Sequence, residues 1–182
     1  YVIFCQNELE PGLKCTENNL KLALEYFRSC LDVVEGKEAT LDVAIFHHNM
    51  ADTLRKMGSF DDALVHYRKS LQIRETLHAE DPVREDIATV LYNIALTQYW
   101  CARYGEATET LEKLLPLRHN LLKKGGELKN YCAALVLKGN CHINQPHEAQ
   151  QAKDSYEKAV DLLLKMSEGQ PDKDCATVIT NL

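Results

Sequence analysis

The sequence predicts an all-α fold in which antiparallel helix hairpins stack on one another as a solenoid. Three observations predict it: the chain repeats itself about every 44 residues, its apolar residues recur at helical spacing, and glycine and proline are scarce. Self-similarity at a fixed period is the sequence signature of stacked repeat units. The 8 Gly and 5 Pro among 182 residues are too few for the many turns of an all-β fold.

The repeat is clearest where residues 42–74 align with residues 86–118, at a shift of 44 (86 − 42). Asp, Ala, Asn, Leu and Arg residues then fall on residues of the same type, although other positions differ. The second stretch is therefore interpreted as a diverged copy of the first.

Further copies extend the repeat in both directions. A shift of 88 (174 − 86) places residues 86–94 on residues 174–182, with five of nine positions identical, and a weaker copy begins at Asn130. Upstream, residues 23–31 match residues 63–71 at a shift of 40 (63 − 23). We therefore expect one array: a partial first unit at 1–36, full units at 37–80, 81–125 and 126–169, and the first helix of a truncated unit at 170–182.

The unit at 37–80 shows why each repeat is expected to be a helix hairpin. Its apolar and small residues recur at i, i+3 and i+4 in both halves, which places them on one face of each of two helices. Gly58 separates the halves and is expected to end the first helix, because glycine tolerates the left-handed conformation there. Ala51 and Ala63 are small enough for two antiparallel helices to approach closely. A single hairpin cannot bury its apolar face, so the units are expected to stack.

Charge and hydropathy exclude two classes of partner. The net charge is −6 and no run of Lys or Arg occurs, so binding to nucleic acid or to anionic lipid is not expected. No stretch approaches the roughly 18 consecutive apolar residues that indicate a membrane-spanning helix. The predicted partner is therefore another protein or a peptide.

The seven cysteines include no C-x-x-C pair, and most lie within apolar helical patterns. We interpret them as reduced thiols that pack as small hydrophobic side chains, which predicts a reducing, cytoplasmic location. The chain begins at Tyr1 rather than Met and shows no signal-peptide pattern. We therefore expect a fragment whose targeting information lies outside it.

Nothing in the sequence is typical of an enzyme, a cofactor site or a metal site. Glycine-rich phosphate loops and nucleophile motifs do not occur. His47 and His48 lie about 100° apart on a helix, so they do not point at one metal ion. Cys141, His142 and His147 lack the second ligand pair of a tetrahedral zinc site. We predict a non-enzymatic protein without cofactor or metal.

In the unit at 37–80, small, glycine and aromatic residues follow one another at Ala51, Gly58, Phe60, Ala63, Tyr67 and Ser70. This order resembles the tetratricopeptide repeat. The usual unit of that family has about 34 residues, whereas the period here is about 44 (86 − 42). Residues 71–95, LQIRETLHAEDPVREDIATVLYNIA, are similar to the long repeats of kinesin light chain and related scaffold proteins. The resemblance implies a right-handed superhelix, with first helices on its concave face and second helices on its convex face.

The resemblance also implies a ligand-binding groove along the first helices. Asn49, Asn93 and Asn181 occupy one repeat position, where in peptide-binding members an asparagine amide hydrogen-bonds the backbone of an extended ligand. The alternative is that these amides bond to neighbouring helices or to water. The expected groove residues are His48, Asn49, Asp52, Arg55, Thr89, Tyr92, Asn93, Leu96, Tyr99, Asn140 and Asn181.

Aromatic and basic residues refine this expectation. Trp100 is expected to pack within its own hairpin, whereas Tyr92 or Tyr99 is expected to face the groove and anchor a ligand side chain. Members of the family that clamp a C-terminal carboxylate need Lys or Arg at first-helix positions. Those positions here hold His48, Tyr92 and Ala133, so no such clamp is expected.

Two functions follow from the predicted fold. The first is a protein–protein interaction scaffold that binds a peptide or helix of a partner in the concave groove. The alternative is a structural, self-assembling or sensor segment of a larger multidomain protein. In that case self-association is expected through exposed terminal helices, where Val178, Ile179 and Leu182 need a covering surface.

Overall fold

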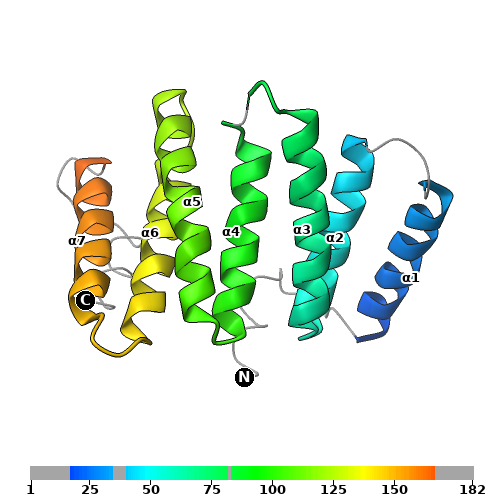
Figure 1. The fold of residues 1–182 in the computed structure, drawn as a ribbon, viewed down its shortest axis with the longest axis horizontal. Coiled ribbons are helices and arrows are strands. Elements are labelled where there is room, and N and C mark those ends of the chain that lie inside the picture. Colours follow the sequence, from blue (N-terminus) through cyan, green and yellow to red (C-terminus); the bar gives the residue numbers. More distant parts are fainter. Residues whose placement is uncertain (1–16, 35–39, 82, 167–182) are drawn as a thin grey trace. The chain divides into compact units, whose positions relative to one another are not determined.

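The computed structural model describes residues 17–34, 40–81 and 83–166, and all regular structure within these ranges is helical (Figure 1). The prediction of an all-α helical repeat fold is confirmed. The truncated unit expected at 170–182, with Asn181, lies outside the described residues. The described helices are α1 (Glu17–Val34), α2 (Leu41–Lys56), α3 (Phe60–Leu77), α4 (Glu85–Trp100), α5 (Tyr104–Lys123), α6 (Leu128–Ile143) and α7 (Ala149–Met166).

The helix starts reproduce the period of the sequence. The first helices α2, α4 and α6 begin at residues 41, 85 and 128, which are 44 and 43 residues apart. The second helices α3, α5 and α7 begin at 60, 104 and 149, which are 44 and 45 residues apart. Helix α1 begins 43 residues before α3 (60 − 17) and therefore corresponds to a second helix.

The chain divides into two compact units, residues 1–77 and residues 78–182. Within the first unit, α2 packs against both α1 and α3. Within the second unit, α4 packs on α5, α5 on α6 and α6 on α7, and α4 also contacts α6. Each hairpin thus buries its apolar face against its own partner helix and against a neighbour, as stacked repeats require.

The turn inside each hairpin contains one residue with positive φ at the same place, two residues before the second helix. These residues are Gly58 (φ 81°), Ala102 (φ 58°) and His147 (φ 67°). The expectation that Gly58 ends the first helix is confirmed, since α2 ends at Lys56. Glycine adopts this conformation without steric cost, whereas alanine and histidine do so at a cost.

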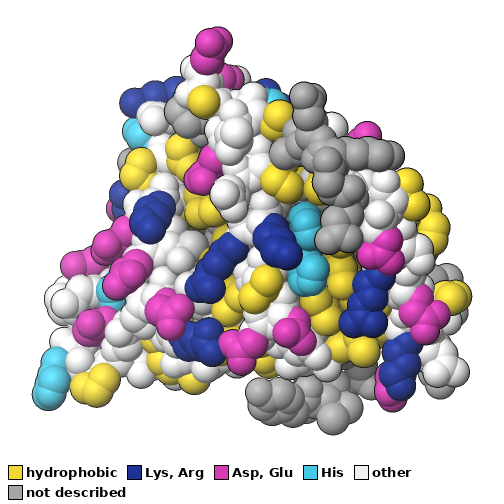
Figure 2. Space-filling view, turned by 45° about the vertical axis from the view of Figure 1, so that its right-hand side comes forward, with side chains coloured by type: hydrophobic (Ala, Val, Ile, Leu, Met, Phe, Trp, Pro, Cys, Tyr) yellow, Lys and Arg dark blue, Asp and Glu magenta, His cyan; other side chains and the backbone are white. Residues whose placement is uncertain are grey.

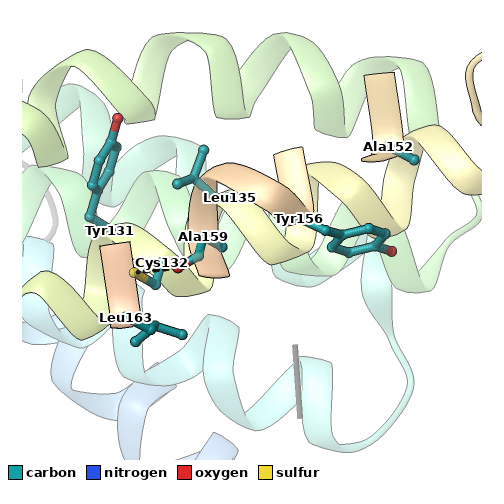
Figure 3. Packing of buried hydrophobic residues seen from close by; sticks show 7 residues of the cluster. All are labelled: Tyr131, Cys132, Leu135, Ala152, Tyr156, Ala159 and Leu163. Carbon is teal, nitrogen blue, oxygen red and sulfur yellow. Dashed lines mark hydrogen bonds between the residues drawn. The ribbon is translucent and has the colours of Figure 1, made fainter. Parts of the chain in front are cut away.

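A hydrophobic cluster joins α6 and α7 in the second unit (Figure 3). Cys132 lies against Ala159, and its Sγ is 3.9 Å from the Ala159 carbonyl oxygen. Gly139 lies beneath the ring of Tyr156, where an added Cβ would come within 2.5 Å of a ring carbon. Glycine is therefore required at this helical position by the close approach of the ring. The buried members of the cluster are Tyr131, Cys132, Leu135, Ala152, Tyr156, Ala159 and Leu163.

The cysteines within the described ranges are thiols. Cys132 and Cys141 are buried, and Cys30 and Cys101 are partly exposed. Burial raises the pKa of the Cys141 thiol to about 12. The neutral thiol is therefore the form that packs in the core at physiological pH.

Candidate binding face of the first helices

The described members of the predicted groove all lie on first helices and are all half-buried. Half-buried side chains are held in place by packing yet keep part of their surface in solvent. Asn181, the eleventh predicted member, lies outside the described residues. In the first unit, α2 carries His48, Asn49, Asp52 and Arg55. In the second unit, α4 carries Thr89, Tyr92, Asn93, Leu96 and Tyr99, and α6 carries Asn140.

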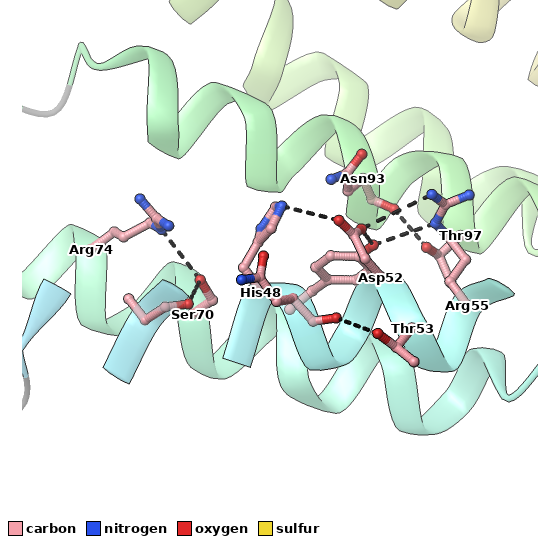
Figure 4. A network of polar contacts seen from close by, with 11 residues as sticks. His48, Asp52, Thr53, Arg55, Ser70, Arg74, Asn93 and Thr97 are labelled. Atoms are coloured by element: carbon pink, nitrogen blue, oxygen red, sulfur yellow. Dashed lines mark hydrogen bonds and ion pairs between the residues drawn. The ribbon is translucent and has the colours of Figure 1, made fainter. Parts of the chain in front are cut away.

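A polar network centred on Asp52 occupies the α2 face (Figure 4). The hydroxyl of Tyr67, from α3, donates a hydrogen bond to Asp52 Oδ1. His48 Nε2 lies 3.6 Å from Asp52 Oδ2, and Arg55 Nη2 lies 4.0 Å from Asp52 Oδ1. The carboxylate is therefore surrounded by donors, which cancels much of the charge of this face.

Burial controls the titration of two side chains in this network. Burial and the Asp52 carboxylate raise the pKa of Tyr67 well above its ordinary value. Burial lowers the pKa of His48, and Arg74 and Arg55 lower it further although Asp52 opposes them. At neutral pH His48 is therefore a neutral hydrogen-bonding group rather than a cation.

The backbone carbonyl of each of the repeated asparagines in α2 and α4 accepts a hydrogen bond from a threonine one turn later in the same helix. Thr53 Oγ1 donates to the carbonyl oxygen of Asn49 at 2.9 Å, and Thr97 Oγ1 donates to that of Asn93 at 2.7 Å. Both threonines are buried. The repeat therefore holds the backbone of each asparagine in the same way in α2 and α4.

The α4 face differs from the α2 face because none of its predicted groove residues carries a charge. Tyr99 lies at the C-terminal end of α4, with ring centroids 5.7 Å from Trp100 and 5.6 Å from Tyr104. Burial raises the pKa of Tyr99, while a hydrogen bond to Asn144 opposes that shift. The aromatic side chain of Tyr99 at the end of α4 is thus held in place by Tyr104 of α5 and by Asn144, the residue that follows α6.

Asn140 of α6 already has a partner within its hairpin. Tyr156 Oη donates to Asn140 Oδ1 at 2.6 Å, the counterpart of the bond from Tyr67 to Asp52. The sequence prediction placed Asp52 and Asn140 in the groove but missed these tyrosine bonds. The sequence contains one feature from which these bonds could have been predicted. Tyr67 and Tyr156 recur on second helices, and the polar residues Asp52 and Asn140 recur on the first helices of the same hairpins.

The described residues contain neither a cluster of metal ligands nor a helix that could span a membrane. Within 17–34, 40–81 and 83–166, no three His, Cys, Asp or Glu side chains converge as ligands for one metal ion. His142 instead pairs through Nδ1 with Glu148 at 2.7 Å. No helix in the described part of the chain is both long enough and apolar enough to span a bilayer.

Sequence comparison identifies the repeat. A family model of the tetratricopeptide repeat matches residues 42–118, the two copies that align at a shift of 44 (86 − 42). These two copies are therefore similar to the tetratricopeptide repeat. No curated protein sequence matches this chain.

Two solved structures share the fold of this chain. BtubC (BKLC) from P. vanneervenii superposes with a TM-score of 0.76 at 20% identity, covering 85% of this chain and 61% of that one. The N-terminal domain of stress-induced protein-1 (STI-1) from C. elegans superposes with a TM-score of 0.58 at 19% identity, covering 80% of this chain and 98% of that domain. The chain thus spans less than two thirds of the BtubC chain. Tetratricopeptide repeats generally mediate protein–protein interactions and are generally not enzymes.

Proposed function

We propose that this chain is an interaction scaffold that binds an extended segment of a partner protein along the first helices α4 and α6 of its second unit. One observation carries the proposal: α4 and α6 contact each other, and both place half-buried polar or aromatic side chains at the predicted groove positions. Adjacent first helices with such side chains suit a ligand that needs both backbone hydrogen bonds and side-chain pockets.

The chemistry of the α4 face favours a neutral or apolar ligand segment. Tyr92, Leu96 and Tyr99 are partly exposed and uncharged, and aromatic anchors contribute a large share of binding energy at interfaces. Asn93 supplies a side-chain amide that both donates and accepts, which suits pairing with a ligand peptide group. An affinity in the micromolar range, about −8 kcal/mol, is expected for such an anchor-and-backbone interaction.

A peptide-library screen against the whole chain, followed by calorimetry on the selected peptide, tests the proposal. The double variant Tyr92→Ala with Asn93→Ala is expected to weaken binding at least about tenfold, a loss of about 1.4 kcal/mol. Asn120→Ala is the matched control, because Asn120 is an exposed asparagine on the second helix α5. Binding that survives the double variant, with the fold intact by circular dichroism, would rule out this face as the ligand site.

The alternative function, self-assembly, has an observation of its own. Leu22, Tyr26 and Val33 are 66%, 64% and 68% exposed and follow one another at spacings of four and seven residues on α1. Such spacing places them on one face, and exposed apolar stripes mark contact surfaces. Light scattering should then show self-association that disappears in Leu22→Lys with Val33→Lys. A wild-type chain that stays monomeric would remove this alternative. The terminal residues Val178, Ile179 and Leu182 lie outside the described residues.

A further inference from the structure

Helices α2 and α3 form an open cavity of about 270 Å³ in the first unit. His47 of α2 lines one side, and the other side is a stripe of α3 formed by Lys69, Gln72, Ile73 and Thr76. His47 and His48 lie about 100° apart on α2, so the cavity is separate from the Asp52 network. Figure 2 shows histidine side chains beside Lys or Arg side chains and apolar side chains on one face of the molecule.

His47, which lines this cavity, forms a hydrogen-bonded imidazole pair with His66. Their Nδ1 atoms are 2.9 Å apart, and the ring centroids are 5.1 Å apart. Two nitrogen lone pairs do not face each other at this separation, so one Nδ1 carries a proton and donates it to the other. Whichever ring accepts at Nδ1 carries its own proton on Nε2, and that N–H remains available for a further acceptor.

The charges around the pair are mainly positive. Burial, His66 and Lys69 lower the pKa of His47 from 6.5 to about 4. Burial, Lys69 and Arg28 of α1 lower the pKa of His66, and the only acid that opposes them there is Asp62. Among the described residues, no carboxylate forms an ion pair with Lys69 or Arg28. Two permanent cations thus act on the imidazole pair, and Asp62 is the one carboxylate among the causes of these shifts.

We propose that this cavity binds a tetrahedral dianion of the kind that a phosphate monoester presents. Lys69 supplies the positive charge at the cavity wall, and the His47 imidazole and the Gln72 amide supply hydrogen-bond donors. Arg28 adds attraction from α1. The same two cations disfavour a divalent metal ion on the imidazole pair, because a metal would add further positive charge to the site.

Binding of the dianion is coupled to proton uptake by the imidazole pair. A nearby negative charge favours the charged form of histidine, so the bound dianion raises the pKa of His47 and His66. The complex therefore holds more protons than the free protein in the range where these groups titrate. By linkage, the affinity rises as the pH falls through that range.

Titration of the whole chain with sodium sulfate, followed by NMR of the backbone and of the imidazole nitrogens, tests the site. Sulfate keeps both charges between pH 6 and 8, so any pH dependence of its binding belongs to the protein. Saturable shifts at His47, His66 and Lys69 are expected, with a dissociation constant of about 1–10 mM. The affinity should rise at least about threefold from pH 7.5 to pH 6.0.

Two lysine variants test whether sulfate binds in this cavity rather than at any exposed lysine. Lys69→Gln should weaken sulfate binding at least about tenfold, because it removes the charge at the cavity wall. Lys56→Gln is the matched control, an exposed lysine at the end of α2, and should bind sulfate as the wild type does. Equal binding by Lys69→Gln and the wild type would overturn the proposal, and so would non-saturable shifts spread over many basic residues. Saturable shifts of His47 and His66 with zinc chloride but not with sulfate would also overturn it and indicate a metal site.

Inorganic phosphate and phenyl phosphate distinguish the source of the dianion. Tighter binding of phenyl phosphate would support a phosphorylated side chain whose organic part packs on Ile73. Equal binding of the two would support the site with free phosphate as its ligand. Binding of neither, at pH 6.5 and up to about 50 mM, would overturn the proposal, because this concentration is well above the expected dissociation constant.

Discussion

Tyr156 Oη donates a 2.6 Å hydrogen bond to Asn140 Oδ1 across the α6–α7 hairpin. Tyr67 makes the equivalent bond to Asp52 across the α2–α3 hairpin. The acceptors are 88 residues apart (140 − 52), and the tyrosines are 89 apart (156 − 67). A buried hydroxyl needs a partner, so tyrosine on the second helix requires a polar residue on the first. In the hairpin between them both places are apolar, Leu96 and Leu111.

Removing these hydroxyls should destabilise the two hairpins unequally. Tyr156→Phe should lower the free energy of unfolding by about 1 kcal/mol, the typical net value of a neutral hydrogen bond. Tyr67→Phe should cost more, about 1.5–2 kcal/mol, because the lost bond goes to a carboxylate. Urea unfolding followed by circular dichroism measures both values. Tyr26→Phe is the control, since Tyr26 is 64% exposed, and a loss as large as that of Tyr156→Phe there would contradict the argument.

Gly139 should not tolerate a side chain, although it lies within a helix. In Gly139→Ala the new Cβ would lie 2.5 Å from the Tyr156 ring, and such overpacking costs about 1–3 kcal/mol. Gly105→Ala is the matched control in α5, where the nearest atom to the new Cβ is Gln145 Oε1 at 3.8 Å. That control should be neutral or gain up to about 1 kcal/mol from helix propensity. Similar thermal midpoints for the two variants would show that the ring moves aside freely.

Much of the fold could be predicted from the sequence, because period and apolar spacing are properties of the chain itself. The helices begin where the 44-residue shift places them, and Gly58 ends the first helix of its hairpin. The positive φ at Ala102 and His147 was not predicted, since neither residue type indicates that conformation. Here the packing of two helices imposes a turn that the local sequence disfavours.

The binding face could be predicted only in outline. The spacing located it on the first helices, but it could not show that Asp52 and Asn140 are bonded by tyrosines from the second helices. Such bonds depend on side-chain reach between helices, which a periodic pattern does not contain. The imidazole pair was missed for the same reason, because His47 and His66 are 19 residues apart (66 − 47) in the chain.

Replacing the strained turn residues with glycine should stabilise the protein. Ala102→Gly should raise the free energy of unfolding by about 0.5–1 kcal/mol, because relief of left-handed strain exceeds the entropy that glycine adds to the unfolded state. Gly58→Ala, at the equivalent position, should lower it by about 1 kcal/mol. Urea unfolding checks both signs together. If both substitutions destabilise, strain does not control these turns.

The His47–His66 pair should make the stability depend on pH. The pKa of His47 is lowered from 6.5 to about 4 in the folded protein, so between these values the unfolded chain binds more protons. Stability therefore rises with pH in this window and is lost as the pH falls from about 6.5 towards 4. Burial is the main cause of this shift, and His66 and Lys69 lower the pKa of His47 further. The charged groups that act on His66 are Lys69, Asp62 and Arg28. Unfolding by urea at pH 5 and pH 7 should show a smaller difference in His47→Gln than in the wild type.

His119→Gln provides the control for that experiment, because His119 lies exposed on α5, away from the pair. Its pH dependence should match that of the wild type. A difference between pH 5 and pH 7 that His47→Gln leaves unchanged would show that other groups dominate acid sensitivity.

Glu85 should stabilise the second unit by holding a buried arginine. Arg118 of α5 is only 6% exposed and donates through Nη1 to Glu85 at the start of α4, which also accepts from Asn130 Nδ2 at 3.2 Å. Glu85→Ala leaves that buried guanidinium without its carboxylate and should cost about 1–2 kcal/mol, since the half-exposed carboxylate is partly screened. Glu112→Ala is the control: Glu112 pairs with Lys138 at 3.4 Å from a more exposed position, and its loss should cost less than about 0.5 kcal/mol. Equal losses in urea unfolding would show that the burial of Arg118 adds nothing to this ion pair.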